Sequence, residues 1–192
     1  MKYLYAAFIS LMILTTSGCV GLLAAGAATT AVVVTDPRSA DQIWADKNIE
    51  LEVAGINNKA PYSGQARITA TSYNGIVVLI GQANTEQISH AFDEKVRKLK
   101  GVKAVHNEIR IMPPLDVGKI SNDTWITTKV KSALLTSHKL NGLDIKVITE
   151  DKETFLFGYV TPQQANVATN ITRNISGVKR VVQAFQYNDK AS

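Results

Sequence analysis

The chain repeats itself after residue 40, and this internal repeat restricts it to two copies of one small fold. The aligned parts are Trp44 with Trp125, residues 74–81 with residues 151–158, and residues 101–105 with residues 177–181. The separation between aligned residues shortens toward the C-terminus, which predicts a few extra residues in the first copy, around residues 57–61. Each copy spans roughly 70 residues, which is near the lower limit for a domain that folds on its own.

Each copy is expected to run helix, strand, strand, helix, strand. In the second copy, Asp123 is the expected N-cap of the first helix. At the helical period, one face of this helix is apolar and should pack on the sheet; it carries Ile126, Val130, Ala133 and Leu134.

Turn and capping residues define the remainder of the second copy. Strands are expected at residues 143–149, 154–160 and 178–187. A helix is expected before the last strand. Thr161 is its expected N-cap, Pro162 occupies its first position, and Gln164 completes a capping box with Thr161. Gly177 is expected to end this helix, and Asn84 is expected to cap the matching helix of the first copy.

These elements predict the α+β class, with two α-β-β-α-β domains that each pack two helices on a three-stranded mixed sheet. Pro113 and Pro114 separate the copies, because neither proline easily extends a helix or a strand. The expected organisation is a signal peptide at 1–18, a lipidated cysteine and tether at 19–40, the first domain at 41–112, a linker at 113–120, the second domain at 121–188 and a tail at 189–192.

Cys19, the only cysteine, ends a segment with the layout of a secretory signal peptide. Lys2 precedes a short apolar stretch, and residues 4–14 are too few for a membrane-spanning helix of about 20 residues. The small residues before Cys19 resemble the bacterial lipobox, with Thr16 where that pattern usually has leucine. Cys19 is therefore predicted to be the acylated N-terminus of the mature chain, anchored by chains such as palmitate.

Two alternatives remain for this segment: an ordinary signal peptide with an incidental cysteine, or an uncleaved helix that continues through residues 20–23. Val20 follows Cys19 where inner-membrane lipoproteins often have aspartate, which favours the periplasmic face of the outer membrane. A single cysteine provides no disulfide framework, so an apolar core has to stabilise the fold.

The composition is that of a globular protein, with 45% hydrophobic and 19% charged residues. The formal charge of +5 favours acidic partners. Beyond the inner membrane, anionic phospholipid is a more plausible partner than nucleic acid.

The repeat resembles the BON domain family. The resemblance rests on the helix 123–135, a strand that closes on glycine, and the late segment Gly177–Val181, and it covers nearly all of the chain after residue 40. It implies two BON-type domains. For outer-membrane lipoproteins with two such domains, it further implies binding of anionic phospholipid, enrichment at division sites and a role in outer-membrane integrity.

The first helix of the second copy offers the candidate lipid-binding face. At about 100° per residue, Trp125 and Leu135 fall outside the buried arc of this helix. An exposed tryptophan beside lysines suits the headgroup region of a bilayer. The predicted phospholipid-binding residues are Trp125, Thr128, Lys129, Lys131, Ser132 and Leu135.

A structural role for Trp125 is the alternative, because Trp44 at the aligned position suggests that both tryptophans pack on the other domain or on the linker. The first helix of the first copy carries Asp46, Glu50 and Glu52, which an anionic surface would repel. The second copy is therefore expected to bind, and the first to support it.

A run of cations closes the second helix of the first copy: Lys95, Arg97, Lys98, Lys100 and Lys103. It is interpreted as a solvated face that complements the helix C-terminus, with a secondary lipid contact as the alternative.

The sequence offers no catalytic constellation. His90, His106 and His138 stand apart without metal-ligand spacing, and there is no glycine-rich phosphate loop. No catalytic residue, metal, cofactor, small-molecule substrate or nucleic-acid partner is expected.

The predicted function is that of a non-enzymatic lipoprotein on the periplasmic face of the outer membrane. Its second BON domain binds anionic phospholipid, and the protein helps maintain envelope integrity at division sites. The alternative is a periplasmic adaptor or chaperone-like factor that docks envelope proteins. Peptidoglycan attachment is a third possibility, and only the basic charge favours it.

Overall fold

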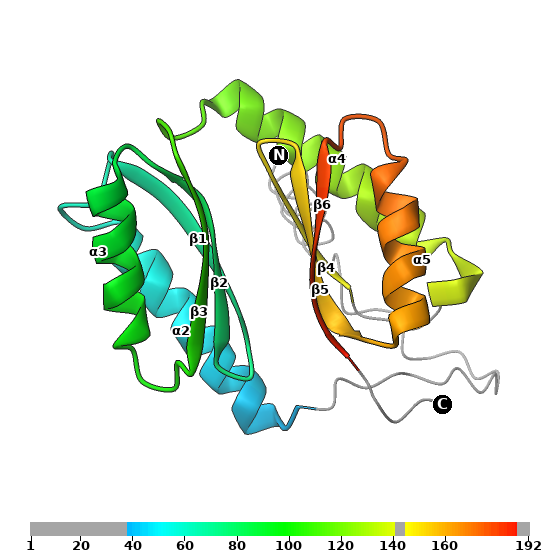
Figure 1. The fold of residues 1–192 in the computed structure, drawn as a ribbon, viewed down its shortest axis with the longest axis horizontal. Helices are drawn as coiled ribbons and strands as arrows, with labels where there is room; N and C mark the ends of the chain where they lie inside the picture. Colours follow the sequence, from blue (N-terminus) through cyan, green and yellow to red (C-terminus); the bar gives the residue numbers. More distant parts are fainter. Residues whose placement is uncertain (1–37, 141–144, 188–192) are drawn as a thin grey trace, which may run out of the picture. The chain divides into compact units, whose positions relative to one another are not determined.

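Two copies of one unit make up the part of the chain that the computed structural model describes, residues 38–140 and 145–187 (Figure 1). The first copy consists of α2 (Ala40–Asn57), β1 (Ala66–Tyr73), β2 (Ile76–Ala83), α3 (Glu86–Arg97) and β3 (Ala104–Ile111). The second copy consists of α4 (Val117–Leu135), the 3-10 turn η1 (His138–Leu140), β4 (Lys146–Glu150), β5 (Glu153–Val160), α5 (Pro162–Arg173) and β6 (Arg180–Tyr187). The predicted signal peptide, Cys19, most of the tether and the tail lie outside the described residues.

Each copy forms one three-stranded mixed sheet, which confirms the predicted fold class. In the first copy β1 pairs antiparallel with β2, and β2 pairs parallel with β3. The second copy repeats this order with β4, β5 and β6. Parallel neighbours cannot be joined by a tight turn, so α3 and α5 provide the crossover connections.

The helices of each copy cover one face of its own sheet. In the first copy, Ile49 of α2 and Phe92 of α3 share a buried cluster with Leu79 of β2. In the second copy, Val130 of α4 and Ala168 of α5 share a cluster with Leu156 of β5. Each domain therefore has its own apolar core between the helices and the sheet.

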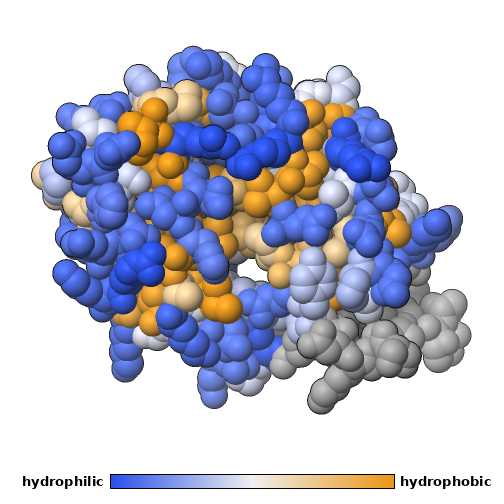
Figure 2. Space-filling view, in the orientation of Figure 1, coloured by the Kyte–Doolittle hydropathy of each residue, from blue (hydrophilic) through white to orange (hydrophobic). Residues whose placement is uncertain are grey.

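The other faces of the two sheets share a third cluster. Its buried members are Ile80 of β2 together with Phe155 and Phe157 of β5. Because β2 and β5 are covered on both faces, they are nearly continuously apolar instead of alternating. Figure 2 shows hydrophobic side chains gathered over the strands, in the middle of the viewed face, with hydrophilic side chains at its sides.

Polar side chains join the two copies around this cluster. Glu150 of β4 accepts hydrogen bonds from Gln82 at 2.7 Å and from Arg67. Lys146 of β4 donates to Glu50 of α2 at 2.8 Å. Other ion pairs link the copies through β3, β5 and β6; these are Arg110 with Glu153 and Arg180 with Glu108.

The buried residues of α2 and α4 do not align in the register that pairs Trp44 with Trp125. The buried residues of α2 are Asp46, Ile49 and Val53, and those of α4 include Asp123, Ile126 and Val130 at the same spacing. Trp44 and Trp125 therefore lie about one helical turn apart in the superimposed repeat, and their alignment was wrong.

The corrected register also removes the extra residues predicted around 57–61. Asp46 lies 28 residues before Asn74, whose N–H it accepts at 2.7 Å. Asp123 lies 28 residues before Asp151, whose N–H it accepts at the same distance. The spacing from helix to hairpin is thus conserved between the two copies.

Several predicted helix ends shift in the structure. Asp116, not Asp123, is the N-cap of α4, and Thr85, not Asn84, is the N-cap of α3. The capping box of Thr161 and Gln164 is confirmed. α5 ends at Arg173, and Gly177 lies in the following loop with a φ of 103°, a conformation that favours glycine.

Candidate functional site

The candidate site is the outer face of α4. The position of the N-cap determines where this helix, and therefore this face, begins. Asp116 accepts the backbone N–H of Lys119 at 2.9 Å, so the helix begins at Val117. It starts inside the segment predicted as a linker, about two turns before Asp123. Its 19 residues give a length of about 28 Å.

The inner face of α4 is buried as predicted. Ile126, Val130 and Leu134 are buried, and Ala133 is half-buried. The buried carboxylate of Asp123 accepts the N–H groups of the β4–β5 turn, so it is directed away from the outer face.

Large apolar side chains remain exposed on the outer face. Trp125 is 61% exposed and Leu135 is 80% exposed. Val117, in the first turn of α4, is 79% exposed. Val117 and Leu135 are 18 residues apart, a whole number of turns at 100° per residue, so they lie on the same line along the helix. Sequence reasoning missed Val117 because it placed the cap at Asp123; Asp116 was the signal that could have located it.

The polar residues between these apolar side chains satisfy hydrogen bonds within the helix. Thr128 Oγ1 donates to the carbonyl of Thr124 at 3.0 Å. The carbonyl of Ser132 accepts from Thr136 Oγ1 at 3.1 Å. Thr128 and Ser132 are both exposed, so the structure places them on the surface with Trp125.

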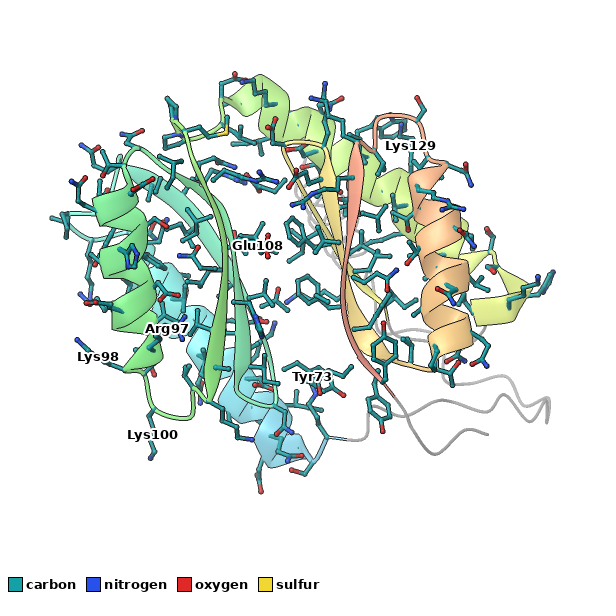
Figure 3. All side chains as sticks on the ribbon, viewed as in Figure 1. Tyr73, Arg97, Lys98, Lys100, Glu108 and Lys129 are labelled. Atoms are coloured by element: carbon teal, nitrogen blue, oxygen red, sulfur yellow. The ribbon has the colours of Figure 1, made fainter. Side chains whose placement is uncertain are left out.

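The two predicted lysines differ in their surroundings. Lys129 is half-buried, and its Nζ donates to the carbonyl of Ser176 in the α5–β6 loop. Figure 3 shows Lys129 beside this loop. Lys131 is exposed. The structure therefore brings Lys131 to the surface of α4 and uses Lys129 to join α4 to the end of the second domain.

The charged residues of α4 give its surface a positive sign. Asp123 is buried, whereas Lys119 and Lys131 are exposed. A positive helix surface with exposed tryptophan and leucine is the combination that suits an anionic membrane interface.

The surface of α2 differs from the prediction in two of its three acids. Asp46 is 3% exposed; its carboxylate accepts Ser72 Oγ at 2.6 Å and the N–H of Gly75 at 2.9 Å. Glu50 is directed toward Lys146 and the N–H of Ser72. The prediction that both carboxylates face outward was therefore wrong.

Hydrogen bonding sets the pKa values of these inward carboxylates. Burial raises the pKa of Asp46, but the hydrogen bonds from Ser72, Gly75, Asn74 and Arg38 outweigh it and hold the pKa below its usual value. Burial likewise raises the pKa of Glu50, and its bonds with Lys146 and Lys47 lower the pKa overall. Both groups are therefore structural anions.

Neither tryptophan packs between the domains. Trp44 is 68% exposed and Trp125 is 61% exposed, which argues against the alternative role of Trp125 in interdomain packing. Asp41 and Glu52 remain exposed on α2 together with Lys47, whereas the exposed charged residues of α4 are Lys119 and Lys131.

Within residues 38–140 and 145–187, no group of histidine, cysteine and carboxylate side chains has an arrangement that could hold a metal ion. None of the helices in the described part combines the length and apolar character needed to span a bilayer.

Comparison with known proteins identifies the repeat. The BON domain model matches residues 45–113 and again residues 122–189. The chain belongs to the BON domain family, and it carries two BON domains.

Relatives extend this likeness over almost the whole chain. The outer membrane lipoprotein DolP of Haemophilus influenzae is 38% identical over 90% of this chain and 90% of its own length. The 21 kDa hemolysin of Actinobacillus pleuropneumoniae is 40% identical over 79% of each chain. The osmotically-inducible protein Y of Escherichia coli is 35% identical, but over 38% of this chain and 37% of its own.

The chain is thus a dual-BON protein of the DolP type. Its likeness to the first relative supports an outer-membrane lipoprotein. None of the three relatives is named as an enzyme.

Proposed function

We propose that this protein is an acyl-anchored lipoprotein whose second BON domain binds anionic phospholipid through the outer face of α4. The observation that carries this proposal is the combination of exposed Trp125 and Leu135 with exposed Lys131 on a helix whose acid is buried. Tryptophan and leucine can enter the headgroup boundary, while a lysine near the surface contributes about 1 kcal/mol of attraction to anionic lipid.

The anchor and the domain have separate roles in this proposal. After cleavage of a signal peptide, acyl chains on Cys19 hold the protein on the periplasmic face of the outer membrane. The face of α4 then makes a weaker contact that senses the lipid headgroups. Because the tether raises the local concentration of the domain, this contact need not be strong. Envelope maintenance at division sites would follow if anionic lipid is enriched there.

Binding can be tested without the anchor. The described residues, 38–140 and 145–187, belong to one compact unit that contains all three apolar clusters. A chain of residues 33–192, which lacks Cys19, is titrated with vesicles of phosphatidylglycerol, and separately with vesicles of phosphatidylcholine, in a co-sedimentation assay. The expected result is tighter binding to phosphatidylglycerol that weakens as salt is added.

Trp125→Glu on α4 is compared with Leu51→Glu on α2, because both replace a mostly exposed apolar side chain with the same acid. Trp125→Glu should abolish most of the binding, and Leu51→Glu should retain most of it. Equal affinity for the two lipids, or unchanged binding in Trp125→Glu, would overturn the proposal. Photo-crosslinks from positions 125 and 135 to one envelope protein, without lipid binding, would instead support an adaptor.

A further inference from the structure

A second cationic surface lies at one end of the first BON domain. Lys98, Lys100 and Lys103 follow α3 and are all exposed. Arg97 beside them is paired, since its Nε donates to Asp93 at 2.6 Å and its Nη2 donates to the carbonyl of Val105 at 2.9 Å. Figure 3 shows Lys98 and Lys100 directed away from the body of the domain.

The fold brings these lysines to the beginning of α2. The backbone N–H of Lys103 donates to the carbonyl of Gly75 at 2.8 Å, and its Nζ lies 3.3 Å from Asn74 Oδ1. The same Asn74 Oδ1 accepts from Gln42 Nε2 at 3.4 Å. The α3–β3 loop, the β1–β2 turn and the first turn of α2 therefore meet at this end.

The first turns of α2 also expose apolar side chains. Trp44 is 68% exposed and Ile43 is 39% exposed. The exposed acids nearest this end are Asp41, in the first turn of α2, and Glu94, in the last turn of α3, while Asp46 and Asp93 are buried. Glu52 and Glu86 are also exposed, but they lie toward the other ends of these helices. The exposed cations outnumber the exposed acids, and a tryptophan accompanies them.

The covalent path from Cys19 enters the first domain at this same end. Residues 20–37 separate Cys19 from Arg38, and even fully extended they reach at most about 65 Å. If Cys19 is acylated, the first part of the folded chain to follow the anchor is the beginning of α2. This end is thus the part of the folded chain with the shortest covalent path to the anchor.

We propose that this end of the first BON domain, formed by Lys98, Lys100, Lys103 and Trp44, is a second membrane contact that docks on the anionic phosphate headgroups of the bilayer carrying the anchor. The proposal rests on the acylation of Cys19 in the proposed function, but it does not require that α4 bind lipid. Lysines attract an anionic surface and tryptophan favours the interface. Together with the anchor, the contact restricts how the first domain lies on the membrane.

Tryptophan fluorescence can report on this surface separately from the outer face of α4. They are the only tryptophans in the sequence, and each belongs to one proposed surface. The full acylated lipoprotein is reconstituted in vesicles of phosphatidylethanolamine and phosphatidylglycerol that contain a brominated phospholipid. In Trp125→Phe, quenching by bromine reports on Trp44 alone; in Trp44→Phe, it reports on Trp125 alone.

Trp44 is expected to be quenched in Trp125→Phe, and less quenched in vesicles of phosphatidylcholine. Adding Lys98→Glu and Lys100→Glu should lower its docking equilibrium constant by about tenfold or more. The control adds Lys59→Glu and Arg173→Glu, which reverse two exposed cations that belong to neither proposed surface. Lys59 follows the far end of α2, about 27 Å from its beginning.

The outcomes separate this inference from the proposed function. Unquenched Trp44 with quenched Trp125 would overturn the second contact and leave the α4 site standing. Quenched Trp44 with unquenched Trp125 would support the second contact and contradict the α4 site. Equal losses in the test and control pairs would also overturn the inference, because net charge alone would then explain docking.

Discussion

Asp46 and Asp123 occupy the same place in the two BON domains. Each carboxylate lies on the buried face of the first helix and accepts the backbone N–H groups of the turn between the first two strands. These turns have positive φ angles, at Asn74 and Gly75 in one copy and at Asp151 and Lys152 in the other. A left-handed turn leaves successive N–H groups pointing the same way, and one carboxylate can satisfy two of them. The aspartates thus fix each helix to its hairpin.

Replacing these aspartates should destabilise both domains. Asp46→Ala or Asp123→Ala leaves the turn N–H groups without their acceptor, which is expected to lower the free energy of unfolding by about 2–4 kcal/mol. Urea denaturation followed by circular dichroism measures the change. Glu52→Ala, an exposed change on α2, should stay within about 0.5 kcal/mol. A similarly small loss for Asp46→Ala would contradict the structural role.

Glu50 should contribute stability that depends on pH. Its folded-state pKa lies below the usual value of 4.5 because the bonds with Lys146 and Lys47 outweigh burial. A lowered pKa stabilises the fold above the unfolded value, and this contribution is lost as the pH falls through the folded value. The stability difference between the wild type and Glu50→Gln should therefore be constant near neutrality and shrink below pH 4.5.

Urea unfolding at a series of pH values checks this expectation. Glu52→Gln is the control for removal of a carboxylate from the same helix. A difference that grows as the pH falls would show that the Glu50–Lys146 contact does not stabilise the charged carboxylate.

Ile80 should matter to stability although it lies outside the helix-covered core of its own domain. It is 1% exposed and packs with Phe155 and Phe157 of the second domain. Ile80→Ala is expected to cost about 2–4 kcal/mol, through lost burial and the cavity that remains. Val78→Ala, at a partly buried position beside the same cluster, should cost less. Equal, small losses in urea denaturation would indicate that the sheet faces contribute little to stability.

The fold class was predictable because turn residues and periodicity act locally. Thr161 and Gln164 form their capping box with neighbouring backbone groups, so sequence alone located this end. The register between α2 and α4 does not follow from their tryptophans, because Trp44 and Trp125 are both exposed and share no packing role. The identical spacing of Asp46, Ile49 and Val53 with Asp123, Ile126 and Val130 carried the correct register.

The candidate site was predictable only in part. Helical periodicity placed Trp125 and Leu135 outside the buried arc, and both are exposed. Periodicity cannot tell whether a lysine reaches solvent or a carbonyl on another element, so the sequence predicts the same role for Lys129 and Lys131. The partner of Lys129, the carbonyl of Ser176, lies 47 residues away, and only the tertiary structure brings them together.

The same substitution should therefore affect stability at Lys129 and lipid binding at Lys131. Lys129→Gln removes a charged hydrogen bond to the α5–β6 loop and should lower the free energy of unfolding by about 1 kcal/mol. Lys131→Gln should leave stability nearly unchanged and weaken binding to phosphatidylglycerol vesicles several-fold, since each lysine near the surface contributes about 1 kcal/mol. Urea denaturation and vesicle co-sedimentation of both variants give the comparison. The reverse pattern would mean that Lys129 leaves Ser176 to reach the lipid.

Val117 tests whether the lipid-binding face extends over the whole of α4. It is 79% exposed and lies on the same line along the helix as Leu135. Val117→Asp places a carboxylate where the proposed contact needs an apolar group, and it should weaken phosphatidylglycerol binding by about tenfold. Asn122→Asp is the matched control, because it adds the same charge to an exposed position on another side of α4. Both variants should unfold at nearly the wild-type urea concentration, since neither position is buried. If the two aspartates weaken binding equally, charge and not the position on the helix governs the effect, and the contact is confined to the surroundings of Trp125.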